Sequence, residues 1–139
     1  MQYSFNLGFS YKDFDVNTFW QGIAGVYRYN WDETTISNGG NKTSRWLDRW
    51  SESNPNGSMP RLGGTINNNY SSFWLTKGDY LRLKNLEIGY KIPYGRIYVS
   101  GANLLRFSPF DLWDPEVENT TGAAYPIMKS LSAGFEIKF

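Results

Sequence analysis

The end of the chain alternates between apolar and polar side chains, and this pattern restricts what the chain can fold into. From Leu131 onward the odd positions hold Leu, Ala, Phe, Ile and Phe, whereas Ser132, Gly134, Glu136 and Lys138 hold the even ones. Because successive side chains of a strand point to opposite faces, the pattern predicts a strand with one oily and one wet face. About nine to eleven alternating residues ending on an aromatic suit a membrane-spanning barrel, although a soluble sandwich can end in a similar strand.

Other segments repeat this design. In residues 3–11, Tyr, Phe, Leu, Phe and Tyr alternate with small polar residues. The predicted strands are 3–11, 14–29, 79–92, 95–105 and 127–139. Within 79–92 the apolar phase slips near Lys84 and Asn85, which indicates either a bulge or a strand rising out of the membrane into a paired extension. The sequence pattern does not decide which side chains of 95–105 face inward. The fold class expected is all-β, an antiparallel up-and-down meander of about five strands.

The connections between these strands alternate in length. They are short after Tyr11 and Ile92, and long over residues 30–71 and 106–126. Transmembrane barrels have short periplasmic turns and longer extracellular loops, so the alternation predicts that both long segments are extracellular. In the first loop, Trp46, Leu47 and Trp50 recur at helical spacing after Thr43 or Ser44 as an N-cap, which predicts one short helix.

Composition excludes several classes of protein. The chain is 18% aromatic, yet no stretch approaches the roughly 20 apolar residues of a membrane helix. A net charge of +1 without a basic run argues against nucleic-acid binding. Without Cys or His, the chain lacks thiolate metal sites and the commonest general base. Its paired carboxylates lie on loops with no apolar pocket to raise a pKa, so we expect neither an enzyme nor a cofactor.

Several motifs occur in a fixed order along the chain. They are GDYLRLKNLEIGYKIP (Gly78–Pro93), RIYVSGANLL (Arg96–Leu105), DPEV (Asp114–Val117), YP (Tyr125–Pro126) and a terminal GFEIKF. This series resembles the C-terminus of the SusC/RagA family of TonB-linked (TonB-dependent) outer-membrane transporters of Bacteroidetes-type bacteria. Residues 11–26 resemble the preceding strands of that family, and the likeness is weakest over 30–70.

The resemblance implies that residues 1–139 are the C-terminal part of a receptor β-barrel, the last five strands of about 22 around a plugged lumen. Such proteins import glycans or peptides across the cell outer membrane. The implied partners are membrane lipid, a SusD-like surface lipoprotein, an oligosaccharide or peptide substrate, and the TonB complex, which would act through an N-terminal part that lies outside this chain. The strand pattern is already under way at Tyr3 without a signal peptide, so we expect the chain to begin within a larger protein. The turn from Ile92 to Arg96 is shorter than the family pattern predicts.

Tryptophans in the loops are candidates for contact with a substrate or partner. Trp46, Trp50 and Trp113 could stack on sugar rings, and Trp74 is a related candidate. An indole also suits a membrane interface, where one side of the ring is wet and the other is oily. The sequence favours the interfacial or loop-packing interpretation over ligand contact.

The second long loop gathers carboxylates at Asp111, Asp114, Glu116 and Glu118. Such a group could bind a hard cation such as calcium, but the spacing is not that of an EF-hand. Solvated charges, or an Asp-Pro turn that fixes the strand exit, are the favoured interpretations. We therefore predict no metal site.

The terminal aromatic strand has one further implied role. The resemblance implies that Phe135, Ile137 and Phe139 form a signal read by the barrel-insertion machinery, and the alternative is that Phe139 only anchors the periplasmic interface. The other functional class left open is a soluble, aromatic-rich β-sandwich that binds carbohydrate. That alternative needs a second sheet to cover the oily face, and the sequence supplies no strands for one.

Overall fold

The computed structural model describes residues 1–30, 44–63, 69–117 and 125–138. The chain forms two compact units, which are described separately. The sheet unit comprises residues 1–27, 77–118 and 122–139, and the loop unit comprises 28–76 and 119–121. Among the described residues there is no helix with the length and apolar character needed to cross a membrane.

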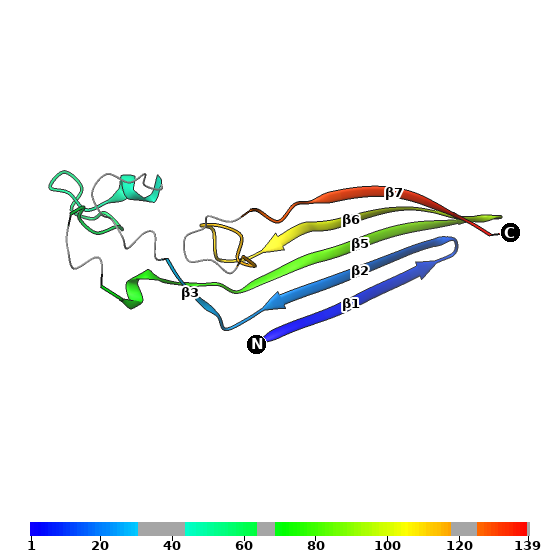
Figure 1. The fold of residues 1–139 in the computed structure, drawn as a ribbon, viewed down its shortest axis with the longest axis horizontal. Coiled ribbons are helices and arrows are strands. Elements are labelled where there is room, and N and C mark those ends of the chain that lie inside the picture. The colour runs from blue at the N-terminus through cyan, green and yellow to red at the C-terminus, as the bar shows by residue number, and fades with distance from the viewer. Residues whose placement is uncertain (31–43, 64–68, 118–124, 139) are drawn as a thin grey trace. The chain divides into compact units, whose positions relative to one another are not determined.

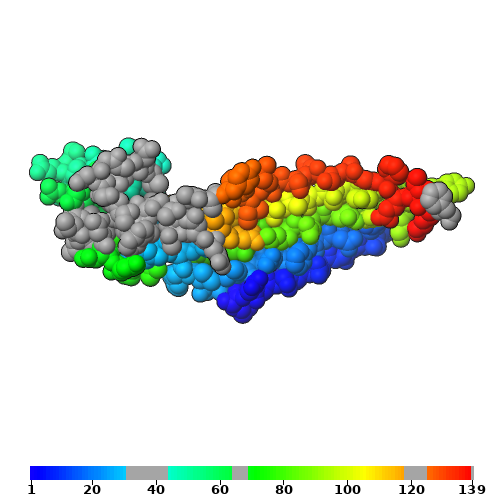
Figure 2. Space-filling view, viewed as in Figure 1, coloured from blue at the N-terminus to red at the C-terminus, as the bar shows by residue number. Residues whose placement is uncertain are grey.

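The sheet unit is one five-stranded antiparallel sheet (Figure 1). Its strands are β1 (Gln2–Tyr11), β2 (Phe14–Ile23), β5 (Tyr80–Ile92), β6 (Gly95–Phe107) and β7 (Ser130–Ile137). They lie in the order β1-β2-β5-β6-β7, and every pair is antiparallel. The predicted all-β meander is therefore confirmed. In Figure 2, β1 in blue and β7 in red border the sheet at its two edges.

Two tight turns close the hairpins at the same end of the sheet (Figure 1). Tyr11 pairs with Phe14, and Ile92 pairs with Gly95, which leaves only the residues between them to turn the chain. In the first turn, Lys12 adopts a left-handed φ of 54°. The long connections leave from the opposite end, so the predicted alternation of short and long links is present in the fold.

A bulge at Lys84 explains the slip in the sequence pattern. Leu83 pairs with Trp20 on β2, but Asn85 pairs with Phe19, so Lys84 is an extra residue between consecutive partners. The extra residue brings Leu81 and Leu83 onto the face that also carries Leu86 and Ile88. On the other side, β6 accommodates the same irregularity with Asn103 at φ 55°. Of the two predicted explanations, the structure shows the bulge.

The strand expected over 14–29 is divided. β2 ends at Ile23, and Gly25 then takes a φ of 73°, a left-handed conformation that cannot continue a strand. Beyond it, β3 (Tyr27–Tyr29) pairs with β4 (Leu75–Lys77) in a separate two-stranded sheet. The first long connection thus carries a short strand at each end. At the other boundaries, β6 runs on to Phe107, and β7 begins at Ser130 instead of Ile127.

The loop unit has a small aromatic core. Trp46, Met59 and Trp74 are each 3% exposed, and Tyr29 packs against them. Trp46 belongs to η1 (Ser44–Asp48), so the predicted helix is present but is a 3₁₀ helix of 5 residues and not an α-helix. A second 3₁₀ turn, η3 (Ser72–Trp74), carries Trp74 and begins at Ser71, whose hydroxyl accepts a hydrogen bond from Phe73 N.

Among the described residues of its own unit, the five-stranded sheet has no second sheet packed on it. Many of its large apolar side chains are consequently exposed, namely Phe5, Leu7, Phe9, Ile88, Val99, Leu131, Phe135 and Ile137. A soluble sandwich would bury this face against another sheet. The fold therefore disfavours the soluble-sandwich alternative.

Candidate functional site

The strand register separates the sheet into an apolar and a polar face. One row of paired residues crosses all the strands as Phe9, Val16, Ile88, Val99 and Ala133. The neighbouring row, on the opposite face, consists of Gly8, Asn17, Glu87, Ser100 and Ser132. Because the rows alternate along the strands, one face of the sheet suits hydrocarbon and the other suits water.

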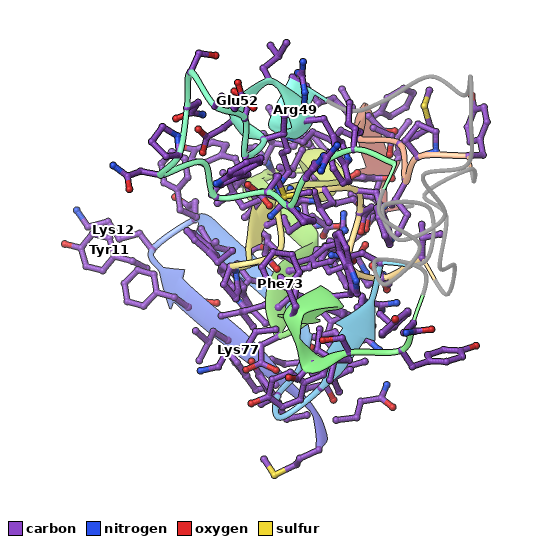
Figure 3. The ribbon with its side chains drawn as sticks, turned by 90° about the vertical axis from the view of Figure 1, so that its left-hand side faces the viewer. Tyr11, Lys12, Arg49, Glu52, Phe73 and Lys77 are labelled. Atoms are coloured by element: carbon purple, nitrogen blue, oxygen red, sulfur yellow. The ribbon has the colours of Figure 1, made fainter. Side chains whose placement is uncertain are left out.

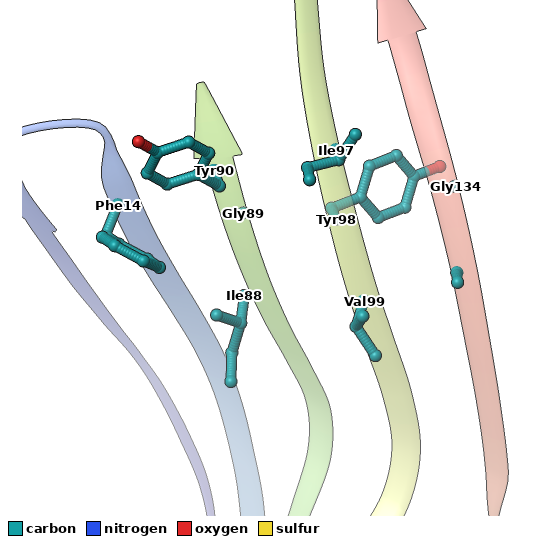
Figure 4. Close-up of a pocket in the computed structure, with 9 residues that line it drawn as sticks. Phe14, Ile88, Gly89, Tyr90, Ile97, Tyr98, Val99 and Gly134 are labelled. Carbon is teal, nitrogen blue, oxygen red and sulfur yellow. The ribbon is translucent and has the colours of Figure 1, made fainter. Parts of the chain in front are cut away.

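The apolar face carries a shallow hollow of about 320 Å³. Figure 4 shows the hollow between Phe14, Ile88, Tyr90, Ile97 and Val99. The rings of Phe14 and Tyr90 lie 4.7 Å apart at its end, near the tight turns. An apolar band that ends in aromatic side chains is typical of a sheet in contact with lipid.

The turn end of the sheet also carries a basic side chain beside an aromatic ring. Lys12 Nζ lies 5.5 Å from the centre of the Tyr11 ring, and Figure 3 shows both side chains pointing away from the sheet. Tyr94, in the second turn, is 79% exposed. Such residues suit the boundary between membrane and water, where a ring can be half immersed and an ammonium can reach the headgroups.

On the polar face, Arg96 of β6 connects four strands near the turns. Its Nε donates to Asp15 Oδ1 of β2 at 3.0 Å, and Nη2 donates to Glu87 Oε1 of β5 at 2.6 Å. Its Nη1 lies 3.5 Å from Glu136 Oε1 of β7. The guanidinium reaches Asp15 by passing over Gly89, where an added Cβ would lie 2.3 Å from Nη2. Gly89 thus leaves the space that the arginine occupies.

A second ion cluster lies at the opposite end of the polar face. Arg82, which is 3% exposed, donates through Nη2 to both carboxylate oxygens of Asp114, at 2.5 and 2.6 Å. Its Nε forms an ion pair of 2.9 Å with Glu116 Oε2, without hydrogen-bond geometry. Lys84, the bulge residue, pairs with the other oxygen of Glu116. Buried arginine needs such partners, because an unpaired buried charge is strongly unfavourable.

The carboxylates of the second loop are therefore partners of strand residues. Burial alone would raise the pKa of Asp114, but the Arg82 guanidinium and the backbone N–H of Glu116 hold that pKa below its usual value. Asp111 is exposed, and Glu118 lies outside the described residues. In the described part of the chain, no group of three or more His, Cys, Asp or Glu side chains is placed to hold a metal ion.

The three candidate tryptophans are divided between the two units. Trp46 is buried in the core of the loop unit, stacked on Trp74 with ring centres 6.2 Å apart. Trp50, in the same unit, is 40% exposed and lines a pocket of about 400 Å³ with Arg49 and Glu52. Both polar residues are labelled in Figure 3. Trp113 belongs to the sheet unit, where its ring packs edge-on against Phe110 at 4.8 Å.

Asp48 organises the backbone around Trp50, a role that sequence reasoning missed. Its carboxylate accepts hydrogen bonds from Ser58 N and Asn54 Nδ2, both at 3.0 Å. Hydrogen bonds from Ser58 and Asn54 lower its pKa. The run of Asn, Pro and Gly that follows Asp48 signals a turn, but it does not show which acceptor closes the turn.

The terminal strand places two of its three predicted signal residues on the apolar face. Phe135 pairs with Ile97, and Ile137 pairs with Gly95. They are 70% and 57% exposed, respectively. Phe139 lies outside the described residues.

The class of the protein follows from these features: the chain is a fragment of the wall of a large transmembrane β-barrel. Its sheet is uncovered and has one apolar and one polar face, with tight turns at one end and long loops at the other. No family model matches the chain. Comparison with individual proteins nevertheless identifies relatives within this class.

Two curated relatives are TonB-dependent receptors of Formosa agariphila. TonB-dependent receptor P3 is 31% identical over 97% of this chain, and receptor P26 is 27% identical over 99%. Among solved structures, the RagAB peptide importer in its open-open state is 28% identical with a TM-score of 0.79, over 99% of this chain. In its closed-closed state, the same importer is 28% identical with a TM-score of 0.80.

The chain spans only 16% and 17% of the two receptors and 17% of the importer chain. The likeness to both the sequences and the structures extends over nearly all of this chain. These comparisons support a segment of a TonB-dependent receptor, which agrees with the barrel wall that the fold defines.

Proposed function

We propose that this chain is the C-terminal wall segment of a SusC/RagA-type, TonB-dependent importer of glycans or peptides in the outer membrane of Bacteroidetes-type bacteria. The observation that carries the proposal is the uncovered sheet with an apolar row beside a polar row. In hydrocarbon, such a sheet satisfies its backbone only as part of a closed barrel. The free edges of β1 and β7 would pair with strands outside this chain.

The orientation follows from the connections. The tight turns at Lys12 and Pro93 would be periplasmic, and the loop unit would lie outside the cell. A SusD-like lipoprotein and the substrate would meet the loop unit there, while the TonB complex would act on another part of the importer. The similarity to the RagAB peptide importer supports a peptide as one of the two substrate classes.

Among the three candidate tryptophans, Trp50 has the best geometry for contact with substrate or partner. Its ring is accessible, and the pocket beside it supplies Arg49, Ser51 and Glu52 as hydrogen-bonding groups. An aromatic face with nearby polar groups suits a sugar ring or a peptide side chain. Trp46 would support this contact from the core of the loop unit. Trp113 would be a separate contact residue within the sheet unit.

The face assignment is tested by two neighbouring substitutions in β6 of the full-length importer. Val99→Lys places a charge on the apolar face, and Ser100→Lys places the same charge on the polar face. A lysine at the bilayer midplane costs about 2–4 kcal/mol, so we expect V99K to reduce the fraction of folded barrel in the outer membrane and S100K to leave it near the unaltered level. Equal tolerance of the two variants would contradict the proposed orientation of the wall.

The insertion signal is a separate proposal. Phe135, Ile137 and Phe139 would present an aromatic-apolar strand end to the insertion machinery. Replacing Phe139 by Ala in the full-length protein should strongly reduce the inserted fraction, measured in outer-membrane preparations. Normal insertion with only slightly lower heat stability would support a simple interfacial anchor instead.

A further inference from the structure

The segment Ser108–Val117, here called the strap, follows β6 and packs against the polar face of the sheet. Ser108 Oγ donates to Asp79 O at 2.7 Å, just before β5. Phe110 is 1% exposed, and Pro115 is also fully buried. Burial of this extent shows that the strap is a packed element and not a freely projecting loop.

Charge complementarity fixes the position of the strap. Arg82 of β5 and Arg106 of β6 are direct cross-strand partners, an arrangement that is destabilising for like charges. Asp114 lies 2.5 Å from Arg82 and 4.0 Å from Arg106, so a single carboxylate neutralises the repulsion between them. Glu116 pairs with both Arg82 and Lys84. The Arg-x-Lys pattern of β5 thus matches the Asp-x-Glu pattern of the strap.

The strap is also rigid within itself. Glu116 N donates to Asp114 Oδ1 at 3.0 Å, which forms an Asx turn around Pro115. Val117 N donates to Asp114 O, also at 3.0 Å. Asp114 therefore holds the local turn and the strand cation together. Lifting the strap would break its ion pairs with the sheet and leave the buried Arg82 without these carboxylate partners.

We propose that the strap is a fixed part of the inner wall of the importer, which places Trp113 on the passage instead of at the cell surface. The inference rests on the proposed function, because that function assigns the polar face to the lumen. It departs from the expectation that residues 106–126 form an extracellular loop. Trp113 packs on the buried Phe110, so its indole is a positioned surface that a passing solute meets.

Cysteine labelling on intact cells tests the position of the strap. This chain contributes no native Cys, and any cysteine elsewhere in the importer is first replaced by Ser. In the full-length importer, Asp111→Cys marks an exposed strap position, and Ser53→Cys marks an exposed position in the loop unit. A bulky, membrane-impermeant maleimide should label S53C readily. It should label D111C at least about tenfold more slowly, since only local opening would expose the strap outside. Equal labelling rates would overturn the proposal.

A second labelling experiment releases the strap by removing its carboxylates. Asp114→Asn with Glu116→Gln should raise labelling of D111C toward the rate of S53C. Asp15→Asn is the matched control, because it weakens the Arg96 cluster on the same face without touching the strap. If the released strap stays protected, the ion pairs do not position it, and the proposal fails.

Failure of the proposed function has a different signature. In that case S53C itself would resist labelling on intact cells, and the V99K and S100K variants would behave alike. A protein that inserts, imports and labels at S53C, but labels equally at D111C, would retain the proposed function and exclude the inner strap. If the released variant does not fold, slow labelling of D111C with the native strap still supports the inner position, and fast labelling still refutes it.

Discussion

The apolar face of the sheet and the core of the loop unit differ in how far their aromatic side chains are exposed. In the sheet, Phe9 and Phe135 are 67% and 70% exposed, whereas Arg82 is 3% exposed. In the loop unit, Trp46 and Trp74 are 3% exposed. The contrast indicates two environments: the apolar face of the sheet suits hydrocarbon, whereas the loop unit closes a small core of Trp46, Met59 and Trp74 within itself. Exposure of an aromatic is therefore informative only when the solvent of that surface is known.

The largest expected effect comes from the core of the loop unit. Trp46→Ala removes a buried indole and should cost about 3–5 kcal/mol in the stability of that unit. In the full-length importer, we expect barrel assembly to persist while the loop unit becomes sensitive to protease added to intact cells. Leu47→Ala, next to it but 82% exposed, is the control and should change neither property. Loss of barrel assembly in W46A would show that the two units do not fold as independently as the contrast implies.

A smaller effect should follow from filling the space over which Arg96 reaches Asp15. Gly89→Val would place Cβ within 2.3 Å of the guanidinium, so the arginine must leave at least one carboxylate, at an expected cost of about 1–3 kcal/mol. The measurement is the temperature at which the folded barrel unfolds in detergent. Gly8→Ala, where the nearest contact would be 3.1 Å from Asn17, is the matched glycine on the same face. Equal shifts in the two variants would remove the special role of Gly89.

The smallest expected effect is the response of the strap to acid. This response should depend on a carboxylate of the sheet unit and not on one of the loop unit. Asp48 and Asp114 both have a pKa below the ordinary 3.8. Hydrogen bonds from Ser58 and Asn54 lower the pKa of Asp48. For Asp114, burial raises the pKa, but interactions led by Arg82 more than offset this and lower it. A carboxylate whose pKa is lowered by folding contributes its full stabilisation above pH 3.8. This contribution is lost as the pH falls through the pKa of the folded state. The strap should thus loosen below pH 3.8, measured as faster proteolysis at 108–117 by an acid-active protease.

Neutralising variants test the assignment of that acid response. Asp114→Asn should reduce the pH dependence of strap cleavage, because the carboxylate with the lowered pKa is then absent and only Glu116 still pairs with Arg82. Asp48→Asn should leave strap cleavage unchanged, since Asp48 belongs to the loop unit. Persistence of the full acid response in D114N would mean that another group controls the strap.

Local periodicity was sufficient to predict the sheet. The alternation in 3–11 and from Leu131 onward predicts two-faced strands, and the turn residues at Lys12 and Pro93 predict the hairpins, because each signal lies within a few residues of its effect. The slip near Lys84 was also visible in the sequence. Its cause was not, because a bulge is defined by the residues opposite it on β2 and β6.

Contacts between distant residues were decided only by the tertiary structure. The sequence showed Asp114 and Glu116 as loop carboxylates, yet their partners Arg82 and Lys84 lie 32 residues earlier in the chain. Periodicity could place Arg82 on one face of a strand, but it could not show that the strap folds back over that face. Likewise, the spacing of Trp46 and Trp50 predicted a helix but not that Trp46 would be buried and Trp50 accessible. That outcome depends on Met59 and Trp74, which reach Trp46 only when the chain closes on itself.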